Sequence, residues 1–231
     1  MLIFFDVDAT LITTSRAGLA AMEAAGRDLF GAGFTVEKTA FAGRLDPLII
    51  ADLLLDNSIE ASQANRRAMR EGYRRYLPEM LAARVCRTCP GVPELLDAIE
   101  GGGSATMGLL TGNYEDTGTV KLRACGIDPG RFDVHVWGDD SPHEPPCREH
   151  LPAVGMERYR YRFGAIHPER ITIIGDTPHD IACAKAHGCR SLGVATGINS
   201  VEDLRSAGAD LAVPDLSDTG AVLRWLLESA A

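Results

Sequence analysis

The sequence lacks the features that mark membrane, secreted and nucleic-acid-binding proteins. No apolar run approaches the roughly 18 residues that a membrane-spanning helix needs. The opening residues have no basic segment, and the first apolar run ends in an acid, Asp6, so they do not resemble a signal peptide. Basic residues are outnumbered by acidic ones, 23 to 32, which gives a net charge of −9. A duplex-binding surface needs the opposite balance. We therefore expect a cytoplasmic protein with no membrane or nucleic-acid partner.

Cysteines are few, and they follow no disulfide or metal pattern. The chain has six, and without an export signal we expect their thiols to be reduced. Cys86 and Cys89 form a Cys-x-x-Cys pair, but a structural zinc site needs four ligands and no second pair lies nearby. His143, Cys147 and His150 form a loose cluster further along. The sequence leaves open whether either group binds anything.

The composition is that of an ordinary globular protein. Hydrophobic residues make up 45% and charged residues 24% of 231 residues. A chain of this length buries about 70% of its surface on folding, which is ample for a core without disulfides or metals. Short apolar runs alternate with helical stretches, which predicts an α/β fold with a Rossmann-like parallel sheet. The expected strands cover residues 2–5, 107–110, 134–137, 171–174, 192–195 and 211–213.

One long segment breaks this alternation. Between residues 15 and 87 we find helical patterns and no convincing strand. One helix is expected to begin near Asp46 and Pro47, and another, over residues 60–83, to be interrupted at Pro78. A helical block of this size after the first strand predicts an inserted domain. We expect a core formed by residues 1–14 and 88–231, and a helical cap formed by residues 15–87.

The residues that close the expected strands suggest the chemistry. Ligands of open α/β sheets bind beyond the carboxyl ends of the strands, where we expect Asp6, Thr111 and Asp176. Asp8 and Asp180 follow closely. Carboxylates crowded at one edge are costly unless a cation lies among them, and oxygen ligands of this kind suit Mg²⁺.

Two of these strand ends lead directly into helices. Residues 111–113 (Thr-Gly-Asn) and 176–178 (Asp-Thr-Pro) each precede a helical stretch. Main-chain amides at a helix N-terminus attract phosphate groups. Carboxylates, a metal and an anion cradle together indicate phosphoryl transfer.

The same segments resemble the motifs of the haloacid dehalogenase superfamily. Residues 5–11 (Phe-Asp-Val-Asp-Ala-Thr-Leu) resemble its first motif, Asp-x-Asp-x-Thr after a buried strand. Residues 109–113 are similar to its second motif, and residues 173–180 match its fourth, Gly-Asp-x-x-x-Asp. The helical block resembles the α-helical cap of phosphoglycolate phosphatase-like members, so the resemblance covers essentially the whole chain.

The resemblance implies a Mg²⁺-dependent phosphomonoester hydrolase that acts on a small phosphorylated metabolite through an aspartyl-phosphate. Asp6 would be the nucleophile, and Asp8 the general acid and then the general base. The phosphoryl oxygens would be held by Thr111 and by the amides of Gly112 and Asn113, while Thr10 would fix the motif loop. The metal would be bound by Asp6, the main-chain carbonyl of Asp8 and Asp176, with Asp180 in support. Asp180 could equally cap its helix, and both roles are compatible.

The sequence departs from the family pattern at two positions. Ala9 stands where glycine is common, which we expect to matter little unless its φ is positive. The lysine of the third motif is absent from residues 141–150. We predict that Arg148 replaces it and neutralises the charge of the nucleophile and the phosphate. Lys121 is the rival, but it lies about seven residues into a helix, some 10 Å from the phosphate end, which is a long reach; the sequence leaves open which residue replaces the lysine.

Specificity should come from the cap, but the substrate itself is not readable. Residues 41–46 resemble the cap loop that enters the active site of related phosphatases, and we expect Arg44 to bind a substrate carboxylate or second phosphate. The alternative for Arg44 is an ion pair on the cap surface. Other readings of the chain are a phosphomutase, a dehalogenase, which the acid at Asp8 disfavours, and a non-catalytic metal-binding protein. A monomer and a homodimer are equally compatible with the sequence.

Overall fold

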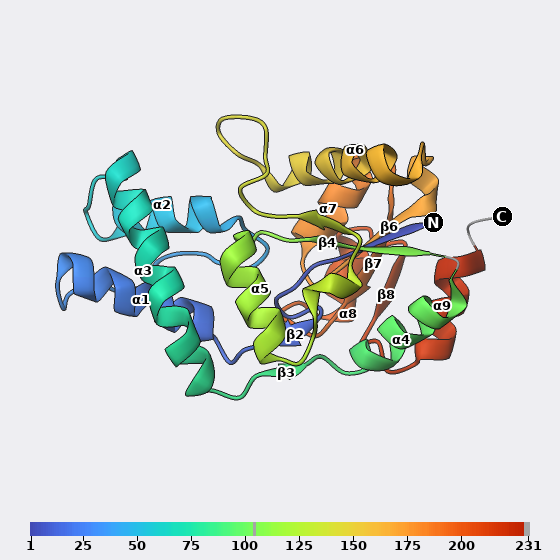
Figure 1. The fold of residues 1–231 in the computed structure, drawn as a ribbon, viewed down its shortest axis with the longest axis horizontal. Coiled ribbons are helices and arrows are strands. Elements are labelled where there is room, and N and C mark those ends of the chain that lie inside the picture. The colour runs from blue at the N-terminus through green and yellow to red at the C-terminus, as the bar shows by residue number, and fades with distance from the viewer. Residues whose placement is uncertain (104, 229–231) are drawn as a thin grey trace.

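A single parallel sheet organises the larger part of the molecule. The computed structural model describes residues 1–103 and 105–228. The sheet has six strands in the order β5-β4-β1-β6-β7-β8, all parallel (Figure 1). Their bounds are β1 Leu2–Phe5, β4 Thr106–Leu110, β5 Val134–Val136, β6 Ile171–Gly175, β7 Arg190–Val194 and β8 Leu211–Val213. The six predicted strands and the α/β fold class are therefore confirmed.

Helices cover both faces of this sheet because its central strand is apolar on both sides. Along β1, Ile3 and Phe5 pack into one cluster, while Leu2 and Phe4 pack into another on the opposite face. Helices α4, α5 and α9 cover the first face, and α6 and α7 the second, with α8 against β7 and β8. Their bounds are α4 Val92–Gly102, α5 Glu115–Ala124, α6 Leu151–Phe163, α7 Pro178–Ala186, α8 Val201–Ser206 and α9 Thr219–Glu228.

The segment after β1 forms a separate group of helices, which Figure 1 shows to one side of the sheet. They are α1 (Ala17–Phe30), α2 (Asp46–Asp56) and α3 (Gln63–Ala82), and they share an apolar cluster of their own. The predicted interruption at Pro78 is wrong, because α3 runs through it. Burial of Leu77 and Leu81 in the helical cluster offsets the hydrogen bond that the proline removes.

The chain enters and leaves this helical group through two adjacent short strands. β2 (Ile12–Thr13) and β3 (Arg87–Thr88) pair antiparallel, so the two connections lie side by side. They coincide with the expected boundaries of the cap at residues 14/15 and 87/88. This geometry is compatible with the predicted division of the chain into core and cap, which remains a prediction.

The carboxyl ends of the three central strands meet at one edge, as predicted. Phe5 of β1 is level with Leu109 of β4 and with Ile174 of β6. The residues that follow these strands, Asp6, Thr111 and Asp176, therefore emerge next to one another. No helix within residues 1–103 and 105–228 is long and apolar enough to cross a membrane.

Candidate active site

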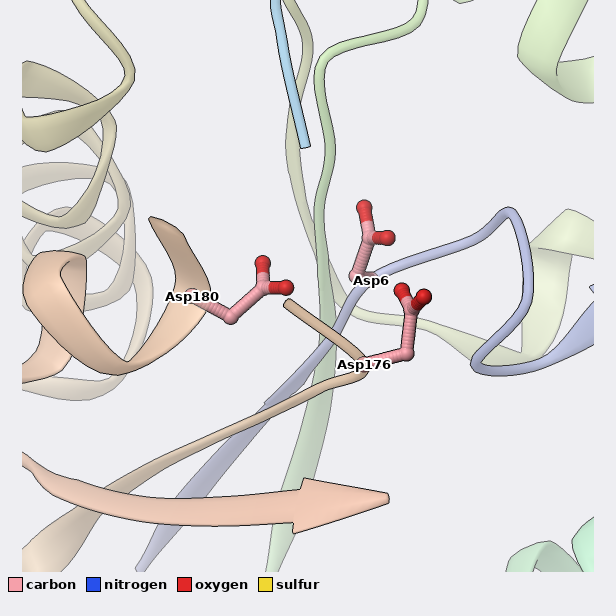
Figure 2. Close-up of side chains that lie close together, drawn as sticks. All are labelled: Asp6, Asp176 and Asp180. Carbon is pink, nitrogen blue, oxygen red and sulfur yellow. The ribbon is translucent and has the colours of Figure 1, made fainter. Parts of the chain in front are cut away.

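Three buried carboxylates form the centre of this edge. Asp6 follows β1, Asp176 follows β6, and Asp180 lies in the first turn of α7. One oxygen of each lies within 4.8 Å of the others, and Figure 2 shows the three groups gathered around the ends of the strands. Within the described part of the chain this is the one such group of metal-ligating side chains. The His143, Cys147 and His150 cluster and the Cys86–Cys89 pair therefore do not form comparable sites.

Burial makes this concentration of negative charge unfavourable. Loss of solvent, together with the charges of Asp6 and Asp180, raises the pKa of Asp176 to about 8. Burial also raises the pKa of Asp6, although Arg148 beside it acts in the opposite direction. A cation among these oxygens would relieve the repulsion, and hard oxygen ligands are those that Mg²⁺ prefers. The residues present thus fit the expected metal.

Asp180 performs the capping role. Its Oδ2 accepts hydrogen bonds from the main-chain nitrogen of Thr177 at 3.0 Å and from the Thr177 hydroxyl at 2.7 Å. Together with the Thr177 side chain this forms a capping box at the start of α7. Its other oxygen, Oδ1, faces Arg148. Asp180 is therefore held rigidly beside the cluster, and its support of a metal remains a prediction.

Arg148 lies within the site and pairs with the expected nucleophile. It lies in a short 3₁₀ turn, Arg148–His150, just before α6. Its Nη2 donates to Asp6 Oδ1 at 2.8 Å and to Asp180 Oδ1 at 2.6 Å, and its Nη1 donates to the carbonyl of Gly43 at 3.2 Å. The Nε–H is also buried, and among the described residues it has no hydrogen-bond partner. Buried donors are almost always satisfied, so this unpartnered N–H is an exception.

Lys121, the rival of Arg148, also reaches the site despite its place in the helix. Its Nζ donates to Asp8 Oδ2 at 2.7 Å and to Asn113 Oδ1 at 2.6 Å. Side chains of a helix lean toward its N-terminus. The long side chain of Lys121 therefore extends back along α5 and covers the distance that the rise per residue predicts. The site consequently holds two cations, Arg148 beside Asp6 and Lys121 beside Asp8.

The expected phosphate-binding loop forms a connected network. Asn113 Nδ2 donates to Asp8 Oδ2 at 2.9 Å and to Thr111 Oγ1 at 2.8 Å. Thr10 Oγ1 lies 3.5 Å from Asp176 Oδ1, at the limit of a hydrogen bond.

Ala9 has a positive φ of 58°. This is the backbone conformation in which alanine is less favourable than the glycine common at this position. A left-handed backbone costs alanine roughly 1–2 kcal/mol. The cost of having alanine in place of glycine is therefore larger than the minor effect expected from the sequence.

The helical group closes over the site through the loop before α2. The amide of Asp46 donates to the carbonyl of Gly112 at 2.7 Å. A Cβ atom on Gly112 would lie 2.1 Å from the carbonyl oxygen of Arg44, so only glycine allows this approach. The Asp46 carboxylate accepts from the main-chain nitrogen of Tyr114 at 3.1 Å. Asp46 thus opens its own helix and also joins the helical group to the start of α5. Its place before Pro47 in the sequence does not reveal this second contact.

Arg44 forms an ion pair with Asp52, which is the alternative to the expected contact with substrate. Its Nη2 lies 2.6 Å from Asp52 Oδ2, and its Nη1 donates to the carbonyl of Ala40. The residue still lines the cavity between the helical group and the sheet edge, which has a volume of about 310 Å³. Contact of Arg44 with a substrate remains a prediction, and it would require a break in the Asp52 pair.

Comparison with known proteins agrees with this geometry. Residues 3–194 match the family model of haloacid dehalogenase-like hydrolases. The chain is 28% identical to the probable phosphatase IndB of Dickeya dadantii, over 98% of this chain and 95% of that one. It is 31% identical to the phosphoglycolate phosphatase of Escherichia coli K12, over 70% of this chain and 58% of that one.

The fold is shared with solved structures. A predicted phosphoglycolate phosphatase from Haemophilus somnus superposes with a TM-score of 0.73 at 21% identity, over 96% of this chain and 97% of that one. Several of the curated relatives that the chain matches are longer, and it spans about half to three fifths of their length. The family match, which covers most of the chain, confirms the resemblance of the motifs: this protein belongs to the haloacid dehalogenase-like hydrolases, a family whose matched relatives here include phosphatases.

Proposed function

We propose that the protein is a Mg²⁺-dependent phosphomonoester hydrolase that acts on a small phosphorylated metabolite. The observation that carries this proposal is the buried pair of Asp6 and Arg148 at the floor of the cavity. Arg148 holds the carboxylate with one end of its guanidinium and keeps an unpartnered Nε–H. An oxygen of a phosphoryl group is the acceptor that a guanidinium fork binds best.

The geometry supports a reaction in two steps. A carboxylate oxygen of Asp6 would attack phosphorus, and the bond between phosphorus and the leaving oxygen would break. Asp8 would give its proton to the leaving alcohol, then remove a proton from the water that hydrolyses the aspartyl-phosphate. Lys121 and Asn113 orient Asp8 by binding one of its oxygens. Thr111 and the amides that follow it would hold the phosphoryl oxygens.

Magnesium would be held by Asp6, Asp176 and the main-chain carbonyl of Asp8, with Asp180 in support. The fit rests on the clustered, buried carboxylates and on the raised pKa of Asp176. The bound metal supplies positive charge beside the phosphoryl oxygens.

Metal-dependent release of inorganic phosphate tests the proposal. We expect the protein to release phosphate from members of a panel of small phosphomonoesters, including p-nitrophenyl phosphate, in the presence of Mg²⁺. Removal of the metal with EDTA should abolish release, and added Mg²⁺ should restore it. Isomerisation of a sugar phosphate without release would indicate a phosphomutase instead. A folded protein that binds Mg²⁺ but turns over no ester would be non-catalytic.

The buried carboxyl cluster also predicts an unusual pH dependence of stability. In the metal-free protein Asp176 keeps its proton up to a pH of about 8, whereas an unfolded aspartate titrates near 4. The folded state therefore binds more protons than the unfolded state between these values, and stability falls as the pH rises through this window. The loss should be on the order of a few kcal/mol.

Thermal unfolding measures this effect. We expect the melting temperature of EDTA-treated protein to fall between about pH 5 and pH 8, and Mg²⁺ to raise it most at the higher pH, where the carboxyls are ionised. Replacement of Asp176 by asparagine should flatten the pH dependence and weaken the response to Mg²⁺. A metal-free protein that became more stable across the same range would contradict the burial of charge argued here.

A further inference from the structure

Two cysteines from distant parts of the chain meet where the helical group joins the sheet. Cys86 lies between α3 and β3, in the second of the two connections, and Cys125 directly follows α5. The Cys125 thiol donates to the carbonyl of Thr13 at 3.8 Å, and Thr13 of β2 is paired with Arg87 of β3. Cys86 precedes Arg87, and its thiol lies within hydrogen-bonding distance of the Cys125 thiol. The two sulfurs are therefore neighbours beside the paired strands β2 and β3.

The spatial partner of Cys86 is not the one that the Cys-x-x-Cys spacing suggests. Cys89 lies beyond β3, is buried, and has its thiol against the Thr196 hydroxyl. Cys86 and Cys125 are free thiols, and both are partly exposed. Within residues 1–103 and 105–228 no third metal-ligating side chain joins these two sulfurs. The reaction that remains for two adjacent, accessible thiols is disulfide formation.

A bond between these sulfurs would join two separately packed parts of the molecule. Cys86 packs against the apolar cluster of the helical group, and Cys125 packs against a cluster of the sheet. Cys125 also ends the helix that carries Lys121, the cation beside Asp8. Any movement of the helical group relative to the sheet must be absorbed at the two connections. A covalent bond from one connection to α5 would therefore restrict that movement.

We infer that Cys86 and Cys125 are a redox-sensitive pair whose reversible disulfide restrains the helical group against the sheet. The oxidant is a small-molecule disulfide such as glutathione disulfide. The Cys86 sulfur attacks one sulfur of the oxidant, whose S–S bond breaks and releases one thiol. The Cys125 sulfur then attacks the Cys86 sulfur of the mixed disulfide and releases the second thiol. The two protein thiols give up two protons and two electrons, and the two released thiols take them up.

The surroundings of Cys125 set the order of these two steps. Burial raises the pKa of Cys125 to about 12, so this thiol keeps its proton and is not the first to attack. The neighbouring Cys86 thiol raises the same pKa further. That contribution disappears once Cys86 is held in a mixed disulfide, because its sulfur then has neither a charge nor a proton. The main-chain nitrogen of Arg87, which donates to the Cys125 sulfur, favours the thiolate in the second step.

Oxidation of the full-length protein tests this inference. After incubation with glutathione disulfide, we expect mass spectrometry of unreduced peptides to link Cys86 with Cys125. The bond closes a loop of roughly forty residues, so the melting temperature should rise by roughly 5–10 °C. Turnover of the best phosphomonoester should fall about fivefold or more, because the helical group opens less readily. Only this last expectation rests on the proposed function. Dithiothreitol should reverse both changes.

Three variants provide the controls. Cys86→Ser and Cys125→Ala each remove one sulfur of the pair and should abolish the response of the melting temperature and of turnover to oxidation. Cys147→Ser removes the other partly exposed cysteine and should respond like the wild type. Melting temperatures of the reduced variants that match the reduced wild type would show that the loss of response comes from the missing sulfur rather than from altered folding.

The outcomes separate this inference from the proposed function. A different disulfide, or mixed disulfides on Cys86 that are never resolved by Cys125, would overturn the pair. A Cys86–Cys125 bond that leaves the melting temperature and turnover unchanged would overturn its role as a restraint. Reduced protein that hydrolyses no ester would overturn the proposed function alone, because the peptide map and the melting temperature do not depend on turnover.

Discussion

Replacement of Asp6 by asparagine is expected to lower kcat by more than about a thousandfold. The amide has nearly the shape of the carboxylate but is a far weaker nucleophile, so no phosphoryl-aspartate can form at a useful rate. Asp6 is buried, and Arg148 holds its carboxylate at 2.8 Å. Phosphate release under single-turnover conditions measures the loss directly.

A matched change elsewhere separates this effect from a general loss of structure. Asp133 precedes β5 and forms an exposed ion pair with Arg162, so Asp133→Asn removes one carboxylate by the same chemical change. We expect its activity to equal that of the wild type. Slow hydrolysis in Asp8→Asn should allow a phosphoryl group to accumulate on the peptide that contains Asp6. Wild-type turnover by Asp6→Asn, or an adduct on another peptide, would assign the nucleophile elsewhere.

The strand ends and their acids were predictable because they depend on local patterns. An apolar run such as Leu2–Phe5 is typical of a strand buried on both faces of a covered parallel sheet, and the residue after such a strand emerges at the carboxyl edge. The same reasoning located Thr111 and Asp176. The α/β fold and the cluster of carboxylates therefore follow from the order of runs along the chain.

The rest of the site depends on packing between distant segments, which no local pattern encodes. Lys121 reaches Asp8 because of the direction of its side chain on α5, not because of its place in the sequence. Asp46 accepts a hydrogen bond from the main-chain nitrogen of Tyr114, 68 residues away. Tyr73 lines the cavity because α3 packs beside α1 and α5. Each of these contacts joins segments that lie far apart in the sequence, where residue spacing gives no distances.

Arg148 gives the second large effect, because it is the cation closest to the nucleophile. Arg148→Met keeps much of the side-chain volume but removes the charge and the donors. We expect kcat/KM to fall about a hundredfold to a thousandfold, the cost of losing a positioned donor to the reacting group. The protein should also lose roughly 3–5 kcal/mol of stability, because the buried carboxylates of Asp6 and Asp180 lose their partner.

The pH profile distinguishes an electrostatic role of Arg148 from a purely structural one. Arg148 lowers the pKa of Asp6 against the effect of burial, so its removal should raise this pKa and keep the nucleophile protonated to a higher pH. The residual activity of Arg148→Met should therefore rise with pH beyond the point at which the wild type levels off. Arg148→Lys keeps the charge but cannot reach Gly43, Asp6 and Asp180 together, so we expect an intermediate activity and a profile closer to that of the wild type.

A surface arginine provides the control for these variants. Arg158 pairs with Asp140 and is partly exposed, and Arg158→Met should leave both kcat/KM and its pH profile unchanged. Unaltered turnover in Arg148→Met would mean that Lys121, the other cation at the site, neutralises the nucleophile and phosphate. A loss of activity with an unshifted pH profile would mean that Arg148 only supports the structure. A large loss together with a shifted profile would establish that Arg148 takes the place of the lysine expected in the third motif.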